Sequence, residues 1–243
     1  MAKELATQLI EQLQAAGVQR IYGIVGDSLN PIVDAVRQTG GSKNGGIDWI
    51  HVRHEEAAAF AAAAEAQLTG KLAVCAGSCG PGNLHLINGL YDANRTGAPV
   101  LAIASHIPSR QIGSGFFQET HPDRLFNECS VYSELISTPE QAPRVMHSAI
   151  QNAVGLGGVA VVTLPGDIAD LEAAAPTPLP ATFRPASLVP DQASVRELAD
   201  AINDAGKVAI FAGAGVAGAH DELISLAAGH QTAKESQDED EFS

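Results

Sequence analysis

The adjacent carboxylates Glu55 and Glu56 open a run made mostly of alanine, "EEAAAFAAAAEAQLTG". The preceding segment "IDWIHV" (47–52) predicts a strand, so the pair falls on the first turn of a helix at a strand's carboxyl end. Apolar neighbours there raise a carboxylate's proton affinity and a helix N-terminus lowers it, so such a group can share a proton with a ring nitrogen. The alternative is that both acids only complement the helix dipole.

Three further turns combine glycine with polar residues: "GDSLNP" (26–31), "GSCGPGNLH" (77–85) and "SHIPSRQIGSGFFQETHP" (105–122). In the second, Gly80 and Gly82 flank Pro81 and allow the backbone to approach a flat ligand closely. The third is long and without periodicity, which is typical of a functional loop. Ligands gather where strands end in parallel α/β sheets, so these turns are the candidate site.

Six short apolar runs position these turns, at 20–26, 47–52, 72–77, 99–105, 132–137 and 158–165. Helical patterns separate them, beginning near Leu5, Asn30, His54, Gly82, Pro122 and Pro139. Strands without polar alternation, separated by helices, predict an α/β domain: a parallel sheet with helices on both faces. The alanines at 57–59 and 61–64 predict very close approach by another helix.

The first domain is predicted over residues 1–171, and five prolines within 172–190 predict a linker. Residues 191–228 begin a second α/β domain, with a helix at 191–203, a strand at 207–213 and a helix at 221–228. Between them "GAGVAG" (213–218) fits the G-x-G-x-x-G dinucleotide fingerprint, a weak signal by itself. Because one strand cannot form a layered core, we expect this second domain to be truncated. The acidic tail 229–243 is expected to be disordered.

Composition excludes several function classes. The net charge of −14 argues against binding of DNA or RNA. Cys75 and Cys79 are spaced C-x3-C without a second pair, so no metal site is predicted and buried free thiols are expected. Without an apolar run long enough to span a membrane or a signal peptide, the sequence predicts a cytoplasmic protein.

The stretch "VRHEEAAAFAAAAEAQLTGKLAVCAGSCGPGNLHLINGLYDANRTGAPVLAIASHIP" closely resembles the N-terminal, pyrimidine-binding domain of thiamine-diphosphate enzymes. The nearest branch is pyruvate oxidase, the quinone-linked pyruvate dehydrogenase. "YGIVGDSLNPIVDAV", "GSGFFQETHPDRLF" and "VTLPGDIA" extend the resemblance over about residues 5–170. "FAGAGVAGAHDELI" resembles the opening of the family's central, FAD-associated domain.

The resemblance implies a role for each matching residue. Glu55 corresponds to the glutamate that hydrogen-bonds the pyrimidine ring of thiamine diphosphate and favours the tautomer that forms the ylid. Phe117 and Gln118 correspond to residues of the pocket for pyruvate or a similar 2-oxo acid, shared across a dimer. The expected cofactor-binding residues are Val25, Gly26, Asp27, Gly80, Pro81, Gly82 and Asn83 for the pyrimidine, and Gly213 and Gly215 for FAD.

Simpler interpretations stay open for Phe117, Asn83 and His54. In these interpretations Phe117 fills a core, Asn83 caps a helix, and His54 caps a strand end without taking part in catalysis. In the resembling enzymes a separate domain binds the diphosphate and Mg²⁺ through a Gly-Asp-Gly turn, and electrons pass from FAD to a quinone at the membrane. No Gly-Asp-Gly occurs in this sequence.

Three hypotheses therefore follow from the sequence. The chain is half of an enzyme completed by a partner that carries the diphosphate-binding domain, or a truncated inactive form. The third is a non-catalytic binding module that dimerises through the alanine-rich helix or captures a partner subunit. The pyrimidine-binding segment alone leaves pyruvate oxidase and acetolactate-synthase-like chemistry both open, and "GFFQETHPDRLF" favours the oxidase.

Overall fold

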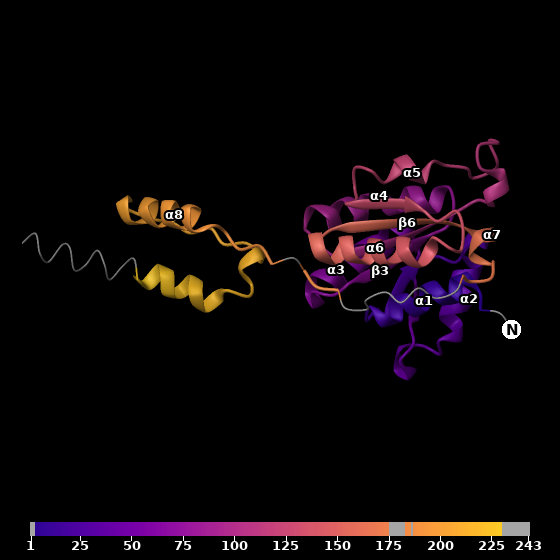
Figure 1. Cartoon of the computed structure of the whole chain (residues 1–243), viewed down its shortest axis with the longest axis horizontal. Coiled ribbons are helices and arrows are strands. Elements are labelled where there is room, and N and C mark those ends of the chain that lie inside the picture. Colours follow the sequence, from indigo (N-terminus) through magenta and orange to yellow (C-terminus); the bar gives the residue numbers. More distant parts are fainter. Residues whose placement is uncertain (1–2, 175–182, 186, 230–243) are drawn as a thin grey trace, which may run out of the picture. The chain divides into compact units, whose positions relative to one another are not determined.

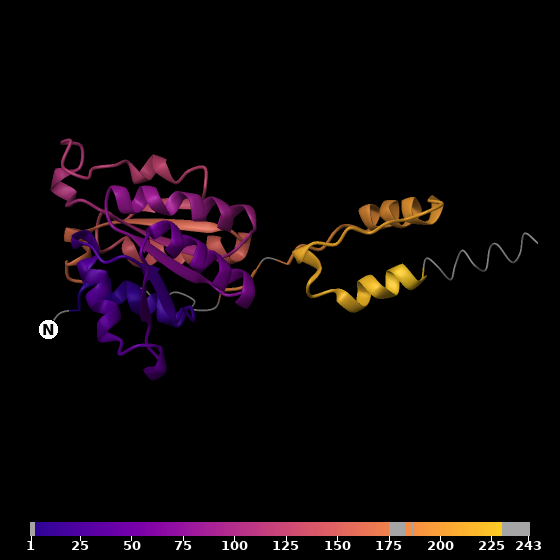
Figure 2. The ribbon, with the colours of Figure 1, turned by 180° about the vertical axis from the view of Figure 1, so that it is seen from behind.

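The computed structural model describes residues 3–174, 183–185 and 187–229. The chain divides into two units, Met1–Ala186 and Ser187–Ser243, which are described separately (Figures 1 and 2). No helix among the described residues is long and apolar enough to span a membrane.

A six-stranded parallel sheet forms the centre of the first unit, in the order β2-β1-β3-β4-β6-β5. Every residue of the three adjacent strands β3, β4 and β6 is buried, which explains why these strands show no polar alternation. The predicted α/β fold and all six predicted strands are confirmed. The strands are β1 Arg20–Gly23, β2 Asp48–His51, β3 Ala73–Gly77, β4 Val100–His106, β5 Tyr132–Leu135 and β6 Val159–Pro165.

Helices cover both faces of this sheet. One buried cluster joins the helices α1, α2 and α6 to one face, and a second cluster joins α3 and α4 to the opposite face. The helices are α1 Leu5–Ala15, α2 Asn30–Gln38, α3 Glu55–Thr69, α4 Pro81–Arg95, α5 Pro122–Leu125, α6 Ala142–Leu156 and α7 Gly166–Ala169.

The prediction of a helix from Pro139 is wrong by three residues, because α6 begins at Ala142 with Pro143 in its first turn. The side chain of Gln141 donates to the carbonyl of Leu135 at 2.7 Å. This bond ties the turn to the end of β5 and delays the start of the helix.

Helices α3 and α4 pack unusually closely, as the alanines predict. Five alanines of α3 are buried: Ala58, Ala59, Ala62, Ala63 and Ala66. Gly89 of α4 lies so near that a Cβ atom placed on it would be 2.6 Å from the Cβ of Ala59. The alanine face is therefore occupied within the chain, and the exposed side of α3 carries Phe60 and Leu68.

The segment after α7 returns to the start of the chain. Leu5 N donates to Leu171 O at 2.8 Å, Ala173 N donates to Lys3 O at 2.8 Å, and Glu4 and Glu172 form an antiparallel bridge. Phe183 packs against the same core as α1 and α6. These contacts involve the first part of the predicted linker, of which residues 175–182 lie outside the described residues.

In the second unit, Asp191 caps the N-terminus of α8 (Gln192–Asp204), and its side chain accepts from the amides of Ala193 and Ser194. A 3-10 turn follows at Ala214–Val216, and residues 220–229 are helical. The strand predicted at 207–213 is wrong, because that described segment pairs with no neighbouring strand. No described residue of 187–229 is fully buried. Apart from Gly229, which is helical, the predicted acidic tail lies outside the described residues.

Candidate functional site

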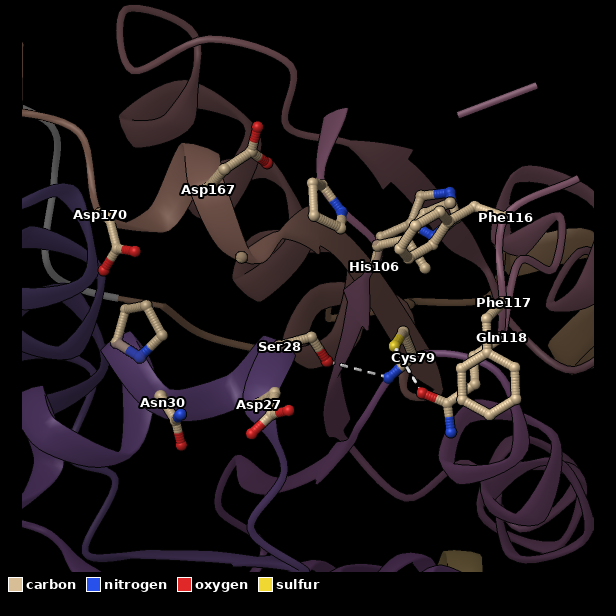
Figure 3. Close-up of a pocket in the computed structure, with 14 residues that line it drawn as sticks. Asp27, Ser28, Asn30, Cys79, His106, Phe116, Phe117, Gln118, Asp167 and Asp170 are labelled. Atoms are coloured by element: carbon tan, nitrogen blue, oxygen red, sulfur yellow. Dashed lines mark hydrogen bonds between the residues drawn. The ribbon is translucent and has the colours of Figure 1, made fainter. Parts of the chain in front are cut away.

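The carboxyl ends of β1, β3, β4 and β6 meet around a cavity of about 590 Å³ (Figure 3). Its walls come from the turns singled out in the sequence and from the start of α7. They comprise Asp27, Ser28, Asn30, Pro31, Cys79, His106, Ile107, Pro108, Phe116, Phe117, Gln118, Gly166, Asp167 and Asp170.

Ser28 connects three of these turns. Its Oγ lies 3.0 Å from Ser78 Oγ and accepts from the amide of Cys79 at 3.0 Å, as Figure 3 shows for the second bond. Its carbonyl accepts from the hydroxyl of Ser105. Ser28 lies inside the "GDSLNP" turn, but its role is not predictable from the sequence, because hydroxyls that bond across 50 residues leave no local pattern.

Phe117 and Gln118 both line the cavity. Phe117 is 80% exposed, so the alternative that it fills a core is wrong. Gln118 has a positive φ of 66°, and its Oε1 accepts from the thiol of Cys79 at 3.5 Å (Figure 3). A Cβ on Gly80 would lie 2.8 Å from both the Cβ and the carbonyl oxygen of Gln118, so only glycine fits there.

Glu119 holds the loop that carries these two residues. Its carboxylate accepts from the amides of Gly113, Gly115 and Phe116, the last two at 2.7 and 3.0 Å. The bond from Gly113, with the other two amides, lowers the pKa of Glu119. Glu119 therefore fixes residues 113–116 of the loop through three backbone amides.

His106 is 4% exposed at the end of β4, and its Nδ1 has no hydrogen-bond partner among the described residues. Burial lowers the pKa of His106, against the opposing effect of Glu119 and Asp123. On the other wall, Asp167 accepts from the amide and hydroxyl of Ser109 at 2.8 and 2.7 Å. Burial, and then the charge of Asp167, raise the pKa of Asp170.

Glu55 is the first residue of α3, is 8% exposed and does not line this cavity. Its Oε2 lies 3.0 Å from His85 Nδ1, and a Cβ on Gly82 would lie 3.2 Å from its Oε1. The carboxylate is thus buried against the α4 N-terminus, with one oxygen close to the backbone of Gly82. A ring nitrogen that hydrogen-bonds this oxygen would fit the arrangement.

Two residues near Glu55, His54 and Asn83, do not have the roles that the simpler interpretations give them. His54 caps a helix rather than a strand end, because its Nδ1 accepts from the amide of Glu56 at 3.3 Å. Asn83 caps no helix: its Nδ2 donates to Ser105 O at 2.7 Å, and its buried Oδ1 has no partner in the described parts of the chain. The side chain of Glu56 accepts from Asn88 and so links α3 to α4.

The predicted residues therefore fall into separate groups. Asp27, Phe117 and Gln118 line the cavity, and Gly80 contacts it through Gln118. Pro81, Gly82 and Asn83 form the first turn of α4 beside Glu55. Gly26 packs against Ser78, and Val25 is 51% exposed. Gly213 and Gly215 belong to the second unit, and their role toward FAD stays a prediction.

Comparison with known proteins identifies the family to which this chain belongs. Residues 3–125 match the family model described as "Thiamine pyrophosphate enzyme, N-terminal TPP binding domain". The chain belongs to the thiamine pyrophosphate enzyme family, of which it carries this N-terminal domain.

Three relatives show how similar individual proteins are to this chain. The chain is 60% identical over 226 residues to an uncharacterized 42.6 kDa protein of Pseudomonas amyloderamosa, covering 92% of this chain. It is 38% identical over 227 residues (93% of this chain) to the putative thiamine pyrophosphate-containing protein YdaP of Bacillus subtilis. It is 41% identical over 160 residues (66% of this chain) to pyruvate oxidase of Lactiplantibacillus plantarum.

These matches cover 56%, 38% and 26% of the relatives' own lengths, respectively. The chain thus spans about half or less of the relatives that it matches. Several acetolactate synthases match as well, at 28–36% identity.

Proposed function

We propose that this chain supplies the pyrimidine-binding part of a thiamine-diphosphate-dependent pyruvate oxidase, or quinone-linked pyruvate dehydrogenase. The overall reaction is decarboxylation of pyruvate to acetate, with electrons passing to FAD. The observation that carries the proposal is the buried carboxylate of Glu55 beside Gly82, in the segment that matches the thiamine pyrophosphate domain.

Glu55 holds and moves the proton in this proposal. Its Oε1, beside Gly82, accepts or donates the proton of a pyrimidine ring nitrogen, while His85 fixes the position of Oε2. When bound, thiamine diphosphate supplies the carbon nucleophile and the electron sink for decarboxylation. Gly82 lacks a side chain that would exclude the ring, and Asn83 fixes the helix start against β4.

The cavity supports a small 2-oxo acid as substrate. Gln118 can donate from its amide nitrogen to a carboxylate, because its Oε1 is already bonded to Cys79. Phe117 is exposed at the same wall and can exclude water from the reacting carbon. Mg²⁺ and the diphosphate are proposed to bind to a Gly-Asp-Gly domain of another polypeptide or of a longer protein, with FAD bound partly by the Gly213 segment.

Acetolactate synthase is the second candidate, supported by the relatives at 28–36% identity. The product distinguishes the two reactions once a diphosphate-binding domain is supplied. The oxidase gives acetate and needs an electron acceptor such as ferricyanide. The synthase gives acetolactate from two pyruvate molecules without an acceptor.

The role of Glu55 can be tested with thiamine, which carries the pyrimidine but no phosphate. In NMR titrations we expect thiamine to shift the amide signals of Glu55 and Gly82, and the Glu55→Gln variant to lose this response because Gln cannot exchange a proton. Glu56→Gln is the matched control, since Glu56 bonds Asn88 and should leave the response unchanged. An unaltered response in Glu55→Gln would contradict the proposal.

A further inference from the structure

His54, Glu55 and His85 form a cluster of potential metal ligands. Each residue offers one nitrogen or oxygen atom, and these atoms lie within 4.8 Å of one another. Two imidazoles and one carboxylate match the donor set of three-ligand zinc sites, which leave a fourth position for water. We propose that this cluster binds a divalent transition-metal ion of the zinc type, independently of any cofactor.

The spacing of the donors requires only small adjustments. A tetrahedral ion with bonds of about 2.0 Å needs ligand atoms ~3.3 Å apart. His85 Nδ1 and Glu55 Oε2 already lie 3.0 Å apart. The rings of His54 and His85 are stacked with centroids 4.3 Å apart, so one ring must turn. Both histidine side chains are about half exposed, at 50% and 44%, so each ring can turn toward solvent.

A second carboxylate supports His54 as a ligand. Glu56 Oε2 lies 3.7 Å from His54 Nδ1, and the other oxygen of Glu56 is held by Asn88. When His54 binds the metal through Nε2, its Nδ1 carries the proton and faces this carboxylate. Carboxylate–histidine–metal arrangements of this kind orient the ring and increase its basicity.

Metal binding has a specific structural consequence for the α3 N-terminus. A neutral imidazole has one lone pair, and His54 uses it to accept from the amide of Glu56. Binding the metal through Nε2 places the proton on Nδ1, so the Glu56 amide loses its acceptor. If Glu55 contacts the pyrimidine as proposed above, the ion would also compete with the ring; this consequence, unlike the site itself, rests on the proposed function.

The test uses the purified chain without a histidine tag and either Zn²⁺, followed by calorimetry, or Co²⁺, followed by visible absorption. We expect saturable binding of one ion per chain and a shifted Glu56 amide signal in NMR. His85→Gln and His54→Asn should each weaken binding by at least tenfold. Asn is a good helix cap, so His54→Asn keeps the helix start intact.

His121→Ala is the matched control, because His121 also lies near a carboxylate, that of Asp123 at 4.0 Å, but outside the cluster. This variant should bind like the parent chain. Absence of saturable binding, or binding that survives both His54→Asn and His85→Gln, would overturn the proposal. Neither result depends on thiamine diphosphate, so the metal site and the proposed function can fail separately.

Discussion

Two buried titratable residues lie near the carboxyl ends of the strands, in different surroundings. Glu55 has a hydrogen-bonding partner in His85, whereas His106 Nδ1 has none among the described residues. A buried imidazole without an acceptor for a second proton is more stable neutral. The neutral side chain of His106 therefore forms part of the cavity wall, and protonation of His106 destabilises the folded state.

The pH dependence of His106 follows from its lowered pKa. Because the folded-state pKa lies below the ordinary value of about 6.5, stability is fully present above that pH and decreases as the pH falls through and below it. We expect an NMR titration midpoint for His106 below 6.5. His106→Gln, which does not titrate, should remove this part of the acid destabilisation in urea unfolding at pH 7.5 and 5.5. A midpoint at or above 6.5 would contradict this expectation.

At the residue scale, the residues that turns and resemblance single out lie partly at the cavity and partly beside Glu55. Asp27, Phe117 and Gln118 were placed by turns and resemblance, and all three line the cavity. Ser28, His85 and His106 were missed as site residues, because their roles depend on contacts with residues distant in sequence. Burial of a histidine at a strand end is visible only once the neighbouring strands are in place.

At the element scale, the α3–α4 pair is held by small residues rather than by large apolar side chains. We expect Gly89→Ala to reduce the free energy of unfolding by about 1–3 kcal/mol, because the added methyl meets the backbone and Cβ of Ala59. Urea unfolding measures this change. Gly155→Ala in α6 is the control: nothing lies within 4 Å of its added Cβ, so stability should rise by about 0.5 kcal/mol. Equal effects of the two substitutions would refute the packing argument.

The loop that carries Phe117 and Gln118 depends on the charge of Glu119. We expect Glu119→Gln to increase hydrogen exchange at the Gly113, Gly115 and Phe116 amides, because a neutral amide oxygen accepts more weakly than a carboxylate. Since the folded pKa of Glu119 is lowered, its contribution is present above the unfolded value near 4.3 and decreases as pH falls through the folded value. In Glu119→Gln this acid dependence should disappear. Exchange at Asp191-capped amides, such as that of Ser194, serves as the unaffected reference.

Strand prediction succeeded where an apolar run lies beside other strands of the same sheet. Runs of buried apolar residues predicted all six strands of the sheet, because a strand covered on both faces needs no polar alternation. The strand predicted at 207–213 has the same composition but no partner among the described residues. A strand is a property of at least two segments, so an apolar run alone does not determine one.

At the scale of the whole molecule, all fully buried described residues belong to the first unit, and no described residue of the second unit is fully buried. Apolar side chains such as Leu198, at 63%, and Phe211, at 102%, are exposed there. The first unit therefore carries the core, the cavity and the Glu55 cluster.

The affinities of the whole chain for thiamine and for thiamine diphosphate can be predicted from its sequence. We expect thiamine and thiamine diphosphate with Mg²⁺ to bind with similar affinity, within about threefold, because the 243 residues contain no Gly-Asp-Gly turn. Charge-assisted phosphate contacts would otherwise add several kcal/mol. Parallel calorimetric titrations decide the question. Binding of the diphosphate at least tenfold more tightly than thiamine would place a phosphate anchor within this chain.

The bonds between residues 3–5 and 171–173 also constrain the order of events during synthesis. During synthesis, the backbone partners of Lys3 and Leu5 leave the ribosome more than 160 residues after Lys3 and Leu5 themselves. Until residues 171–173 are synthesised, α1 of the first unit is only partly anchored. Joining residues 3–5 to residues 171–173 then carries the entropic cost of closing a long loop. Completion of the fold is therefore set by the emergence of the segment after α7. A pause in translation before that point would extend the lifetime of an open, aggregation-prone intermediate.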